Sequence, residues 1–273
     1  MTTAAPMPPG VLLRAPDDGP IVPDETLRGF GGLHGGLALA LLTSAMQRHA
    51  PGLVLRSASA RLHRALTGEF SIVTRVLRPG RVTTLAAEAI AGDRGAGGAA
   101  AGEGPQVDAS AIFAEPRPVD GPVLAPPPPA APPPPECEIF QIPPEFVPIS
   151  QFWQIRPVGP NRPYAGGAEP ELTAWVRLLE DDDPPDVHRL ILLMDALAPA
   201  YAAMLTGLRL IPTVELTVRP GDGLAAASSP WVLLRARTRS AGASGWNEET
   251  VDAWDPSGAH LGSAHQLRLL RGT

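Results

Sequence analysis

An uninterrupted run of uncharged, mostly apolar residues marks the first element along the chain. Between Gly29 and Gln47 no residue carries a fixed charge, and only His34 titrates near neutral pH. A helix that is apolar on all sides is typical of a buried helix. The pattern predicts that it begins at Gly35 and Gly36, where small residues allow close backbone approach, and ends before Pro51.

Shorter segments rich in strand-forming residues follow this helix. They lie near residues 53–66, 69–77, 82–90 and 107–114. The sequence Arg-Pro-Gly-Arg at 78–81 predicts a hairpin turn between the second and third of them. The first half of the chain is therefore expected to contain one buried helix followed by four strands.

The second half repeats this order of elements. A strand is predicted at 171–179, and Asp186 then precedes a buried helix from Val187 to about Ala198 that Pro199 stops. Four further strands are predicted near 214–218, 231–238, 248–254 and 260–270. The fold class that fits this order is α+β, in which an antiparallel sheet wraps around one central helix, twice.

The position of the prolines divides the chain. It contains 34 prolines, and eleven of them lie between Pro116 and Pro135. Such a segment favours an extended polyproline conformation and cannot pair into a sheet. We therefore expect an N-terminal unit at 1–115, a proline-rich linker at 116–135 and a C-terminal unit at 136–273.

Charge and cysteine content exclude several classes of protein. The formal net charge of −6 argues against a nucleic-acid partner. Cys137 is the only cysteine, so neither an intrachain disulfide nor a cysteine-rich zinc site can form. The histidines His63, His260 and His265 show no metal-ligand spacing. No signal peptide or long apolar span is visible, and we expect a cytoplasmic protein without stable membrane insertion.

Asp195 is a charged residue within an otherwise apolar segment, and the pattern of buried elements does not explain it. It is the only charged residue between Leu190 and Leu205. Burial of an isolated carboxylate is costly unless it accepts hydrogen bonds. A carboxylate on a buried helix is therefore a candidate catalytic residue. The structural alternatives are an exposed helix edge or an ion pair with an arginine.

Thr213 and Gln266 lie on predicted strands, where both residue types are common for structural reasons alone. Strict alternation along the strand places Thr213 on the face of Glu215, opposite Leu216, unless the strand bends near Pro212. We therefore expect Thr213 to point away from the central helix if the backbone is regular.

Four short motifs resemble the acyl-CoA thioesterase II family, the double-hotdog thioesterases. "LLMDALAP" is similar to the family's segment with the catalytic Asp, "IPTVELTVRP" to the strand with the catalytic Thr, and "GSAHQLRLL" to the final strand with the catalytic Gln. "FGGLHGGLALALL" resembles the glycine turn and central helix of a hotdog unit. The resemblance implies a tandem (double) hotdog and points to Asp195, Thr213 and Gln266 as the catalytic residues.

The same resemblance implies hydrolysis of acyl-CoA thioesters in fatty acid metabolism, without a metal or other cofactor. It also implies a homo-oligomer, because the edge strands of hotdog units usually pair into larger sheets. In this hypothesis Asp195 accepts a proton from water, while Thr213 and Gln266 hold that water. Unpaired backbone N–H groups at Gly35 and Gly36, with His34 beside them, are expected to bind the thioester oxygen.

Other functions stay open at this point. The first alternative is a non-catalytic acyl or acyl-CoA binding protein on the same fold, since fold alone does not determine function. Convergence of the three candidate side chains beside an apolar tunnel would favour the enzyme. A hotdog-type enoyl-CoA hydratase is disfavoured because neither helix carries an Asp/His pair. Arg235, Arg237 and Arg239 alternate on one strand, where they either meet coenzyme phosphates or form a solvated or subunit-facing surface.

Overall fold

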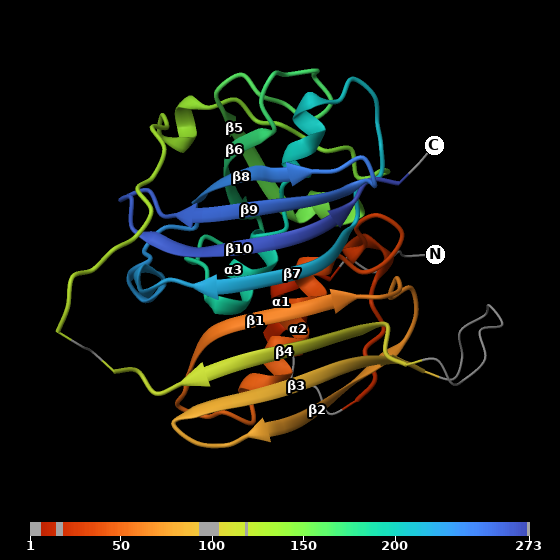
Figure 1. The fold of residues 1–273 in the computed structure, drawn as a ribbon, viewed down its shortest axis with the longest axis vertical. Coiled ribbons are helices and arrows are strands. Elements are labelled where there is room, and N and C mark those ends of the chain that lie inside the picture. Colours follow the sequence, from red (N-terminus) through yellow and green to blue (C-terminus); the bar gives the residue numbers. More distant parts are fainter. Residues whose placement is uncertain (1–6, 15–18, 93–103, 118–119, 272–273) are drawn as a thin grey trace.

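One antiparallel sheet of ten strands organises the part of the chain that the computed structural model describes, residues 7–14, 19–92, 104–117 and 120–271 (Figure 1). The strands are β1 Val54–Leu62, β2 Phe70–Arg78, β3 Val82–Ala91, β4 Val107–Ala114, β5 Trp153–Val158, β6 Glu171–Leu178, β7 Thr213–Pro220, β8 Val232–Ala241, β9 Trp246–Trp254 and β10 His260–Leu269. Their spatial order is β2-β3-β4-β1-β7-β10-β9-β8-β6-β5.

The sheet contains an internal repeat. The order β2-β3-β4-β1 is mirrored by β8-β9-β10-β7, and the two sets meet where β1 pairs with β7. Strands β5 and β6 extend the second set at its outer edge. The two halves of the sequence therefore share one continuous sheet instead of two separate ones.

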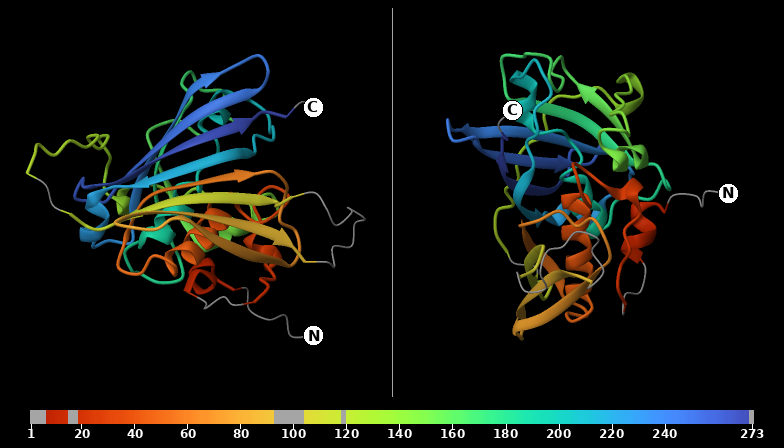
Figure 2. Two further views of the ribbon diagram at one scale, coloured as in Figure 1. Left: turned by 60° about the horizontal axis from the view of Figure 1, so that its bottom comes forward. Right: turned by 90° about the vertical axis from the view of Figure 1, so that its right-hand side faces the viewer.

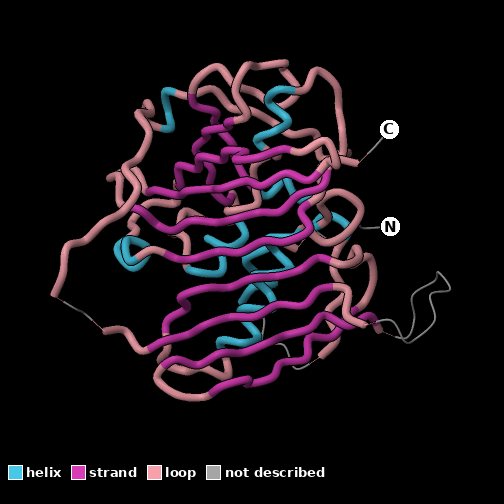
Figure 3. Tube along the Cα trace, in the orientation of Figure 1, coloured by secondary structure: helices cyan, strands magenta, loops and turns pink. Residues whose placement is uncertain are grey.

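Three α-helices lie among the described residues: α1 Pro9–Arg14, α2 Gly35–Gln47 and α3 Val187–Leu193. Helices α2 and α3 pack together on one side of the sheet (Figures 2 and 3). Helix α2 is the central helix of the first half, and ten of its residues are buried. Its lack of charged residues follows directly from this position. One antiparallel sheet with a buried helix against each of its two halves agrees with the α+β class and the repeated element order expected from the sequence.

The second helix is shorter than its apolar pattern predicts. We expected it to run to about Ala198, but α3 ends at Leu193. The N–H groups of Asp195 and Ala196 bond to carbonyls three residues back, which is a turn and not a continuing helix. Asp195 therefore lies just beyond the helix and not on it. Helix α1 and strand β5 were not predicted from the sequence.

The described part of the proline-rich segment packs against the outer face of the sheet. The indole N–H groups of Trp254 and Trp175 donate to the carbonyl oxygens of Pro126 and Pro132, both at 2.8 Å. Cys137 is buried in a small cluster with these two indoles. Figure 1 shows the segment along the left side of the molecule. It is therefore anchored to the second half by specific contacts.

Among the described residues, none of the helices is both long enough and apolar enough to cross a lipid bilayer. Short 3₁₀ helices at 25–27, 134–136, 148–152, 200–204 and 222–226 complete the regular structure.

Candidate functional site

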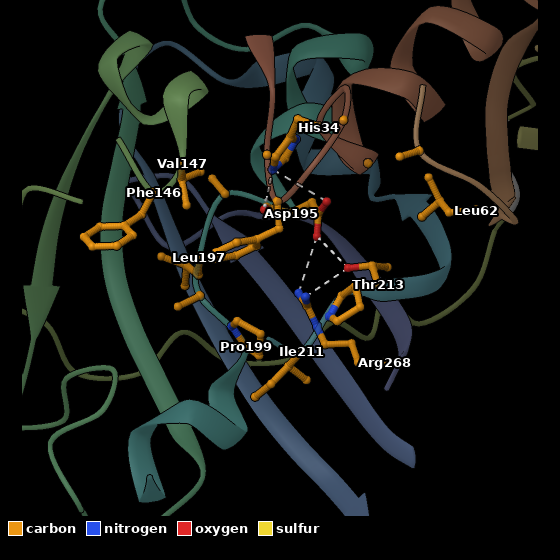
Figure 4. A pocket seen from close by; sticks show the side chains of 18 of the residues that line it. His34, Leu62, Phe146, Val147, Asp195, Leu197, Pro199, Ile211, Thr213 and Arg268 are labelled. Carbon is orange, nitrogen blue, oxygen red and sulfur yellow. Dashed lines mark hydrogen bonds and ion pairs between the residues drawn. The ribbon is translucent and has the colours of Figure 1, made fainter. Parts of the chain in front are cut away.

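A cavity of about 500 Å³ opens between the two halves of the molecule. Its walls come from the turn before α2, the end of β1, the segment that precedes β5, the loop after α3, the start of β7 and the end of β10. Most of the lining is apolar. Figure 4 shows Phe146, Val147 and Leu197 on one side of the Asp195 carboxylate and Leu62 on the other. Asp195 and Thr213 are among the polar residues in the wall.

The Asp195 carboxylate faces the N-terminus of α2. Its Oδ2 atom accepts a hydrogen bond from the backbone N–H of Gly36 at 2.9 Å. The N-terminal end of a helix carries unpaired N–H groups and a partial positive charge, and both stabilise a carboxylate. A backbone group of the first half of the chain thus binds the Asp195 side chain of the second half.

Glycine at the start of α2 makes this approach possible. A methyl group on Gly36 would lie 2.9 Å from Asp195 Cβ and 2.9 Å from the carbonyl oxygen of Leu192. A methyl group on Gly35 would lie 3.0 Å from Asp195 Oδ2. The sequence predicted that the backbone at these glycines approaches another group closely, and that group is the loop that carries Asp195.

Three side chains converge on the other carboxylate oxygen, Asp195 Oδ1. Gln266 Nε2 donates to it at 2.8 Å and Thr213 Oγ1 at 3.3 Å. Arg268 Nη2 lies 3.4 Å from the same atom (Figure 4). The structure thus brings Asp195, Thr213 and Gln266 together, although they are separated by up to 71 residues.

A β-bulge turns Thr213 toward this cluster. Strand β10 pairs Leu267 with Glu215 and then Arg268 with Thr213, so Val214 is passed over. The extra residue reverses the alternation beyond that point. The sequence expectation that Thr213 points away from the central helix, on the face of Glu215, applied only to a regular strand. The bulge is an irregularity of the kind for which that expectation made an exception.

Arg268 links the other members of the cluster. Its Nη1 donates to Thr213 Oγ1 at 2.9 Å, and its Nη2 donates to Gln266 Oε1. Its Nε donates to Glu249 Oε1 at 3.2 Å. The Arg268 side chain is 6% exposed, and that of Glu249 only 1%. A buried ion pair therefore stands directly behind the carboxylate.

Glu249 anchors this arrangement from β9. Besides Arg268, it accepts a hydrogen bond from the backbone N–H of Ala200. Burial raises the pKa of the Glu249 carboxyl, while the nearby Arg268 charge acts in the opposite direction. Glu249 lies directly opposite Gln266 in the register of β9 and β10.

His34 packs on the backbone of Asp195. Its Nε2 lies 3.0 Å from the Asp195 carbonyl oxygen, which can only accept, so this nitrogen carries the proton. Its ring meets Trp153 edge-on, with ring centroids 5.3 Å apart. Burial lowers the pKa of the His34 imidazole below its usual value, although the Asp195 carboxylate opposes that effect.

One sequence expectation about the helix start was wrong. The N–H of Gly36 is not unpaired, because it donates to Asp195 Oδ2. Because α3 ends at Leu193, the turn that follows it brings the Asp195 carboxylate against the N-terminus of α2, where it occupies the N–H group of Gly36. The backbone N–H of Gly35 has no partner among the described residues. Gly35 also lines the cavity, whereas Gly36 and Gln266 do not.

Sequence inspection missed Arg268 and Glu249. The alternation of a strand could have found both. Arg268 is two residues from Gln266 and therefore lies on the same face of its strand, and Glu249 is likewise two residues from the apolar Val251. Coenzyme phosphates and a solvated or subunit-facing surface were the two alternatives for Arg235, Arg237 and Arg239, and none of the three lines the cavity. Arg235 stacks on Trp254 at 5.2 Å, and Arg237 pairs with Glu171.

The described residues contain no group of three His, Cys, Asp or Glu side chains arranged to hold a metal ion. His63 instead pairs with Asp108 at 2.5 Å, and Arg61 also contacts that carboxylate. These hydrogen bonds lower the pKa of Asp108 although partial burial raises it.

Comparison with solved structures places the fold among hotdog proteins. A hotdog-fold protein of unknown function from Alicyclobacillus acidocaldarius superposes with a TM-score of 0.81 at 20% identity, covering 96% of this chain and 97% of the other. A candidate thioesterase II from Thermobifida fusca gives 0.79 at 24% identity, covering 98% and 99%. The acyl-CoA thioesterase II TesB2 from Mycobacterium marinum gives 0.67 at 20% identity, covering 88% and 89%. These similarities establish a double-hotdog protein.

Sequence comparison then identifies the family. Residues 23–114 match the acyl-CoA thioesterase N-terminal domain, and residues 118–270 match the acyl-CoA thioesterase C-terminal domain. The chain belongs to the acyl-CoA thioesterase family. A sequence search of curated proteins finds no match to this chain.

Proposed function

We propose that this protein hydrolyses acyl-CoA thioesters, with Asp195 as the general base. The observation that carries the proposal is the convergence of Thr213 and Gln266 on the Asp195 carboxylate, whose residue lies in the wall of an apolar cavity together with Thr213. A cavity of about 500 Å³ is within the range of small-molecule sites. Its apolar lining favours burial of an acyl chain.

The hydrogen bonds select the carboxylate oxygen that acts as base. Asp195 Oδ1 faces three donors, from Gln266, Thr213 and Arg268. Asp195 Oδ2 accepts from Gly36 N–H, with His34 Nε2 farther away at 3.6 Å. A carboxylate oxygen has two lone-pair positions, so Oδ2 retains one for a water molecule. Thr213 and Gln266 therefore orient the carboxylate, and Thr213 also faces the cavity where the water is held.

In the proposed reaction, the water oxygen forms a bond to the thioester carbonyl carbon while one water proton passes to Asp195 Oδ2. The carbonyl oxygen becomes an oxyanion, which the N–H of Gly35 stabilises. The tetrahedral intermediate then collapses, the carbon–sulfur bond breaks, and the leaving sulfur takes the proton from Asp195. The products are the free acid and the coenzyme A thiol. His34 holds the Asp195 backbone in place through its carbonyl oxygen.

The test is Asp195→Asn, assayed by release of free thiol from acyl-CoA substrates of graded chain length. We expect kcat/KM to fall by about 10² to 10⁴-fold, the usual contribution of a general base. Asp222→Asn is the matched control, because the Asp222 side chain is 95% exposed and lies outside the cavity wall. Circular dichroism and thermal melting check that both variants remain folded.

Binding of a non-hydrolysable thioether analogue separates the enzyme from a non-catalytic binding protein. Asp195→Asn is expected to retain the analogue while losing turnover. A wild-type protein that binds the analogue but hydrolyses none of the acyl-CoA series would establish the binding protein instead. Unchanged turnover in Asp195→Asn would remove this residue from the mechanism.

A further inference from the structure

None of the proposed reaction steps involves the buried ion pair of Arg268 and Glu249 directly. Both side chains are almost fully buried, on the face of β9 and β10 that covers the helices. Taking two charges out of water is costly, and replacing such a pair by apolar residues is often neutral or stabilising. Stability alone therefore gives a weak reason for this pair, and its contacts suggest a more specific one.

Arg268 contacts each of the three converging side chains separately. Nη1 reaches Thr213 Oγ1, while Nη2 reaches both Gln266 Oε1 and Asp195 Oδ1. A guanidinium is planar and rigid, and its donors point in fixed directions. One side chain therefore sets the relative positions of three others.

These contacts also fix the direction of two hydrogen bonds. Because Arg268 donates to Thr213 Oγ1, the hydroxyl must direct its own proton elsewhere, and Asp195 Oδ1 is the acceptor in reach. Because Arg268 donates to Gln266 Oε1, the amide must present its NH₂ group to Asp195. Without the guanidinium, both groups lose the contact that selects this orientation.

Glu249 holds the guanidinium from behind. It binds Nε, the one guanidinium nitrogen that contacts none of the other three side chains, and is itself fixed by the N–H of Ala200. The Asp195 carboxylate is therefore oriented from two sides: by the α2 N-terminus on Oδ2, and by the side chains that Arg268 aligns on Oδ1.

We propose that Arg268, anchored by Glu249, is a positioning residue that aligns Thr213, Gln266 and Asp195 so that Asp195 Oδ2 faces the attacking water. This inference rests on the proposed thioesterase function. It assigns Arg268 a role that depends on the fork-shaped arrangement of its guanidinium donors and not only on its positive charge.

The decisive variant is Arg268→Lys, which keeps the positive charge but replaces the fork by a single donor atom. A displacement of about 1 Å in a reacting group can cost a hundredfold in rate. We expect kcat to fall by roughly tenfold to a hundredfold, while KM changes less than about threefold, because Arg268 lines only the polar corner of the cavity and the apolar lining is unchanged. Arg189→Lys is the matched control, since Arg189 is another buried, ion-paired arginine that lies outside the cavity wall.

A second variant adds a chemical rescue. Arg268→Ala leaves space beside the cavity, and added guanidinium chloride at millimolar concentration is expected to restore part of kcat. If Arg268→Ala does not fold because Glu249 is left unpaired, the double variant Arg268→Ala with Glu249→Gln removes that buried charge and permits the same measurement.

The outcomes separate the two proposals. Wild-type kcat in Arg268→Lys would show that charge alone suffices and would overturn the positioning role. A proportional loss in Arg189→Lys, or a lower melting temperature with kcat unchanged, would assign Arg268 a structural role only. If the wild-type protein itself releases no thiol, the proposed function fails before Arg268 is tested. A selective loss of kcat with guanidinium rescue supports the inference.

Discussion

The contact between Gly36 and Asp195 gives the sharpest test of how the two halves build one site. Replacement of a glycine by alanine inside a helix ordinarily stabilises a protein by about 0.5–1 kcal/mol, because glycine has more freedom to lose. At Gly36 the added methyl group would lie 2.9 Å from both Asp195 Cβ and the Leu192 carbonyl oxygen. One of these neighbours is backbone and cannot rotate away. We therefore expect Gly36→Ala to destabilise the protein.

The magnitude follows from two separate effects. Forcing a methyl group into a packed interior costs about 1–3 kcal/mol, which corresponds to a melting temperature lower by roughly 2 to 12 °C. Moving the Asp195 loop also weakens the 2.9 Å hydrogen bond to Oδ2. A hydrogen bond to a charged group contributes about 1.5–3 kcal/mol, so kcat/KM is expected to fall by roughly tenfold to a hundredfold.

The assay combines thermal melting with thiol release, and Gly68→Ala is the control. Gly68 has no heavy atom within 4 Å of an added methyl group, so this variant tests the same chemical change without a clash. It is expected to match the wild-type protein in both measurements. The reasoning is refuted if Gly36→Ala melts at the wild-type temperature and keeps its kcat/KM within about twofold.

Two further predictions concern stability and the proline-rich segment. Burial lowers the pKa of His34 below 6.5. As the pH falls below that value, His34 binds a proton in the unfolded chain but stays neutral in the folded one. The free energy of unfolding therefore decreases by up to about 1.4 kcal/mol per pH unit. Melting at about pH 7.5 and 5.5 should show a smaller loss in His34→Gln than in the wild-type protein, and equal losses would contradict the prediction. Trp175→Phe removes the hydrogen bond to Pro132, so a thiol reagent should label Cys137 faster by roughly tenfold. Trp246→Phe, at an indole that is 41% exposed, should leave the rate unchanged, and no change in either variant would contradict the anchoring.

The strands were predictable because most of them carry a local signal. The run at 107–114 alternates in burial along its whole length and forms β4 within the predicted bounds. Strand β5 was missed because it is short and its outer positions are only partly buried. The end of α3 was also missed. The apolar residues beyond Leu193 are buried by packing in the loop and not by helix periodicity.

Asp195 could be selected from the sequence because a single charge in an apolar stretch needs a partner wherever it lies. Its partners could not be selected in the same way. The bulge at Val214 that turns Thr213 inward depends on pairing between β7 and β10, which are about 50 residues apart. The ion pair behind the site depends on the register of β9 and β10. Each is a long-range contact, and no local pattern encodes it.

The sequence by itself determined every strand except β5, the two buried helices and the residue whose charge required explanation, because periodicity and desolvation act locally along the chain. Only the tertiary structure decided how that charge is held. It brought the N–H of Gly36 to one carboxylate oxygen and the Arg268 cluster to the other. Hydrogen bonds between residues far apart in sequence form only when strand register and helix ends fix their geometry, and here that geometry is shared between both halves of the chain.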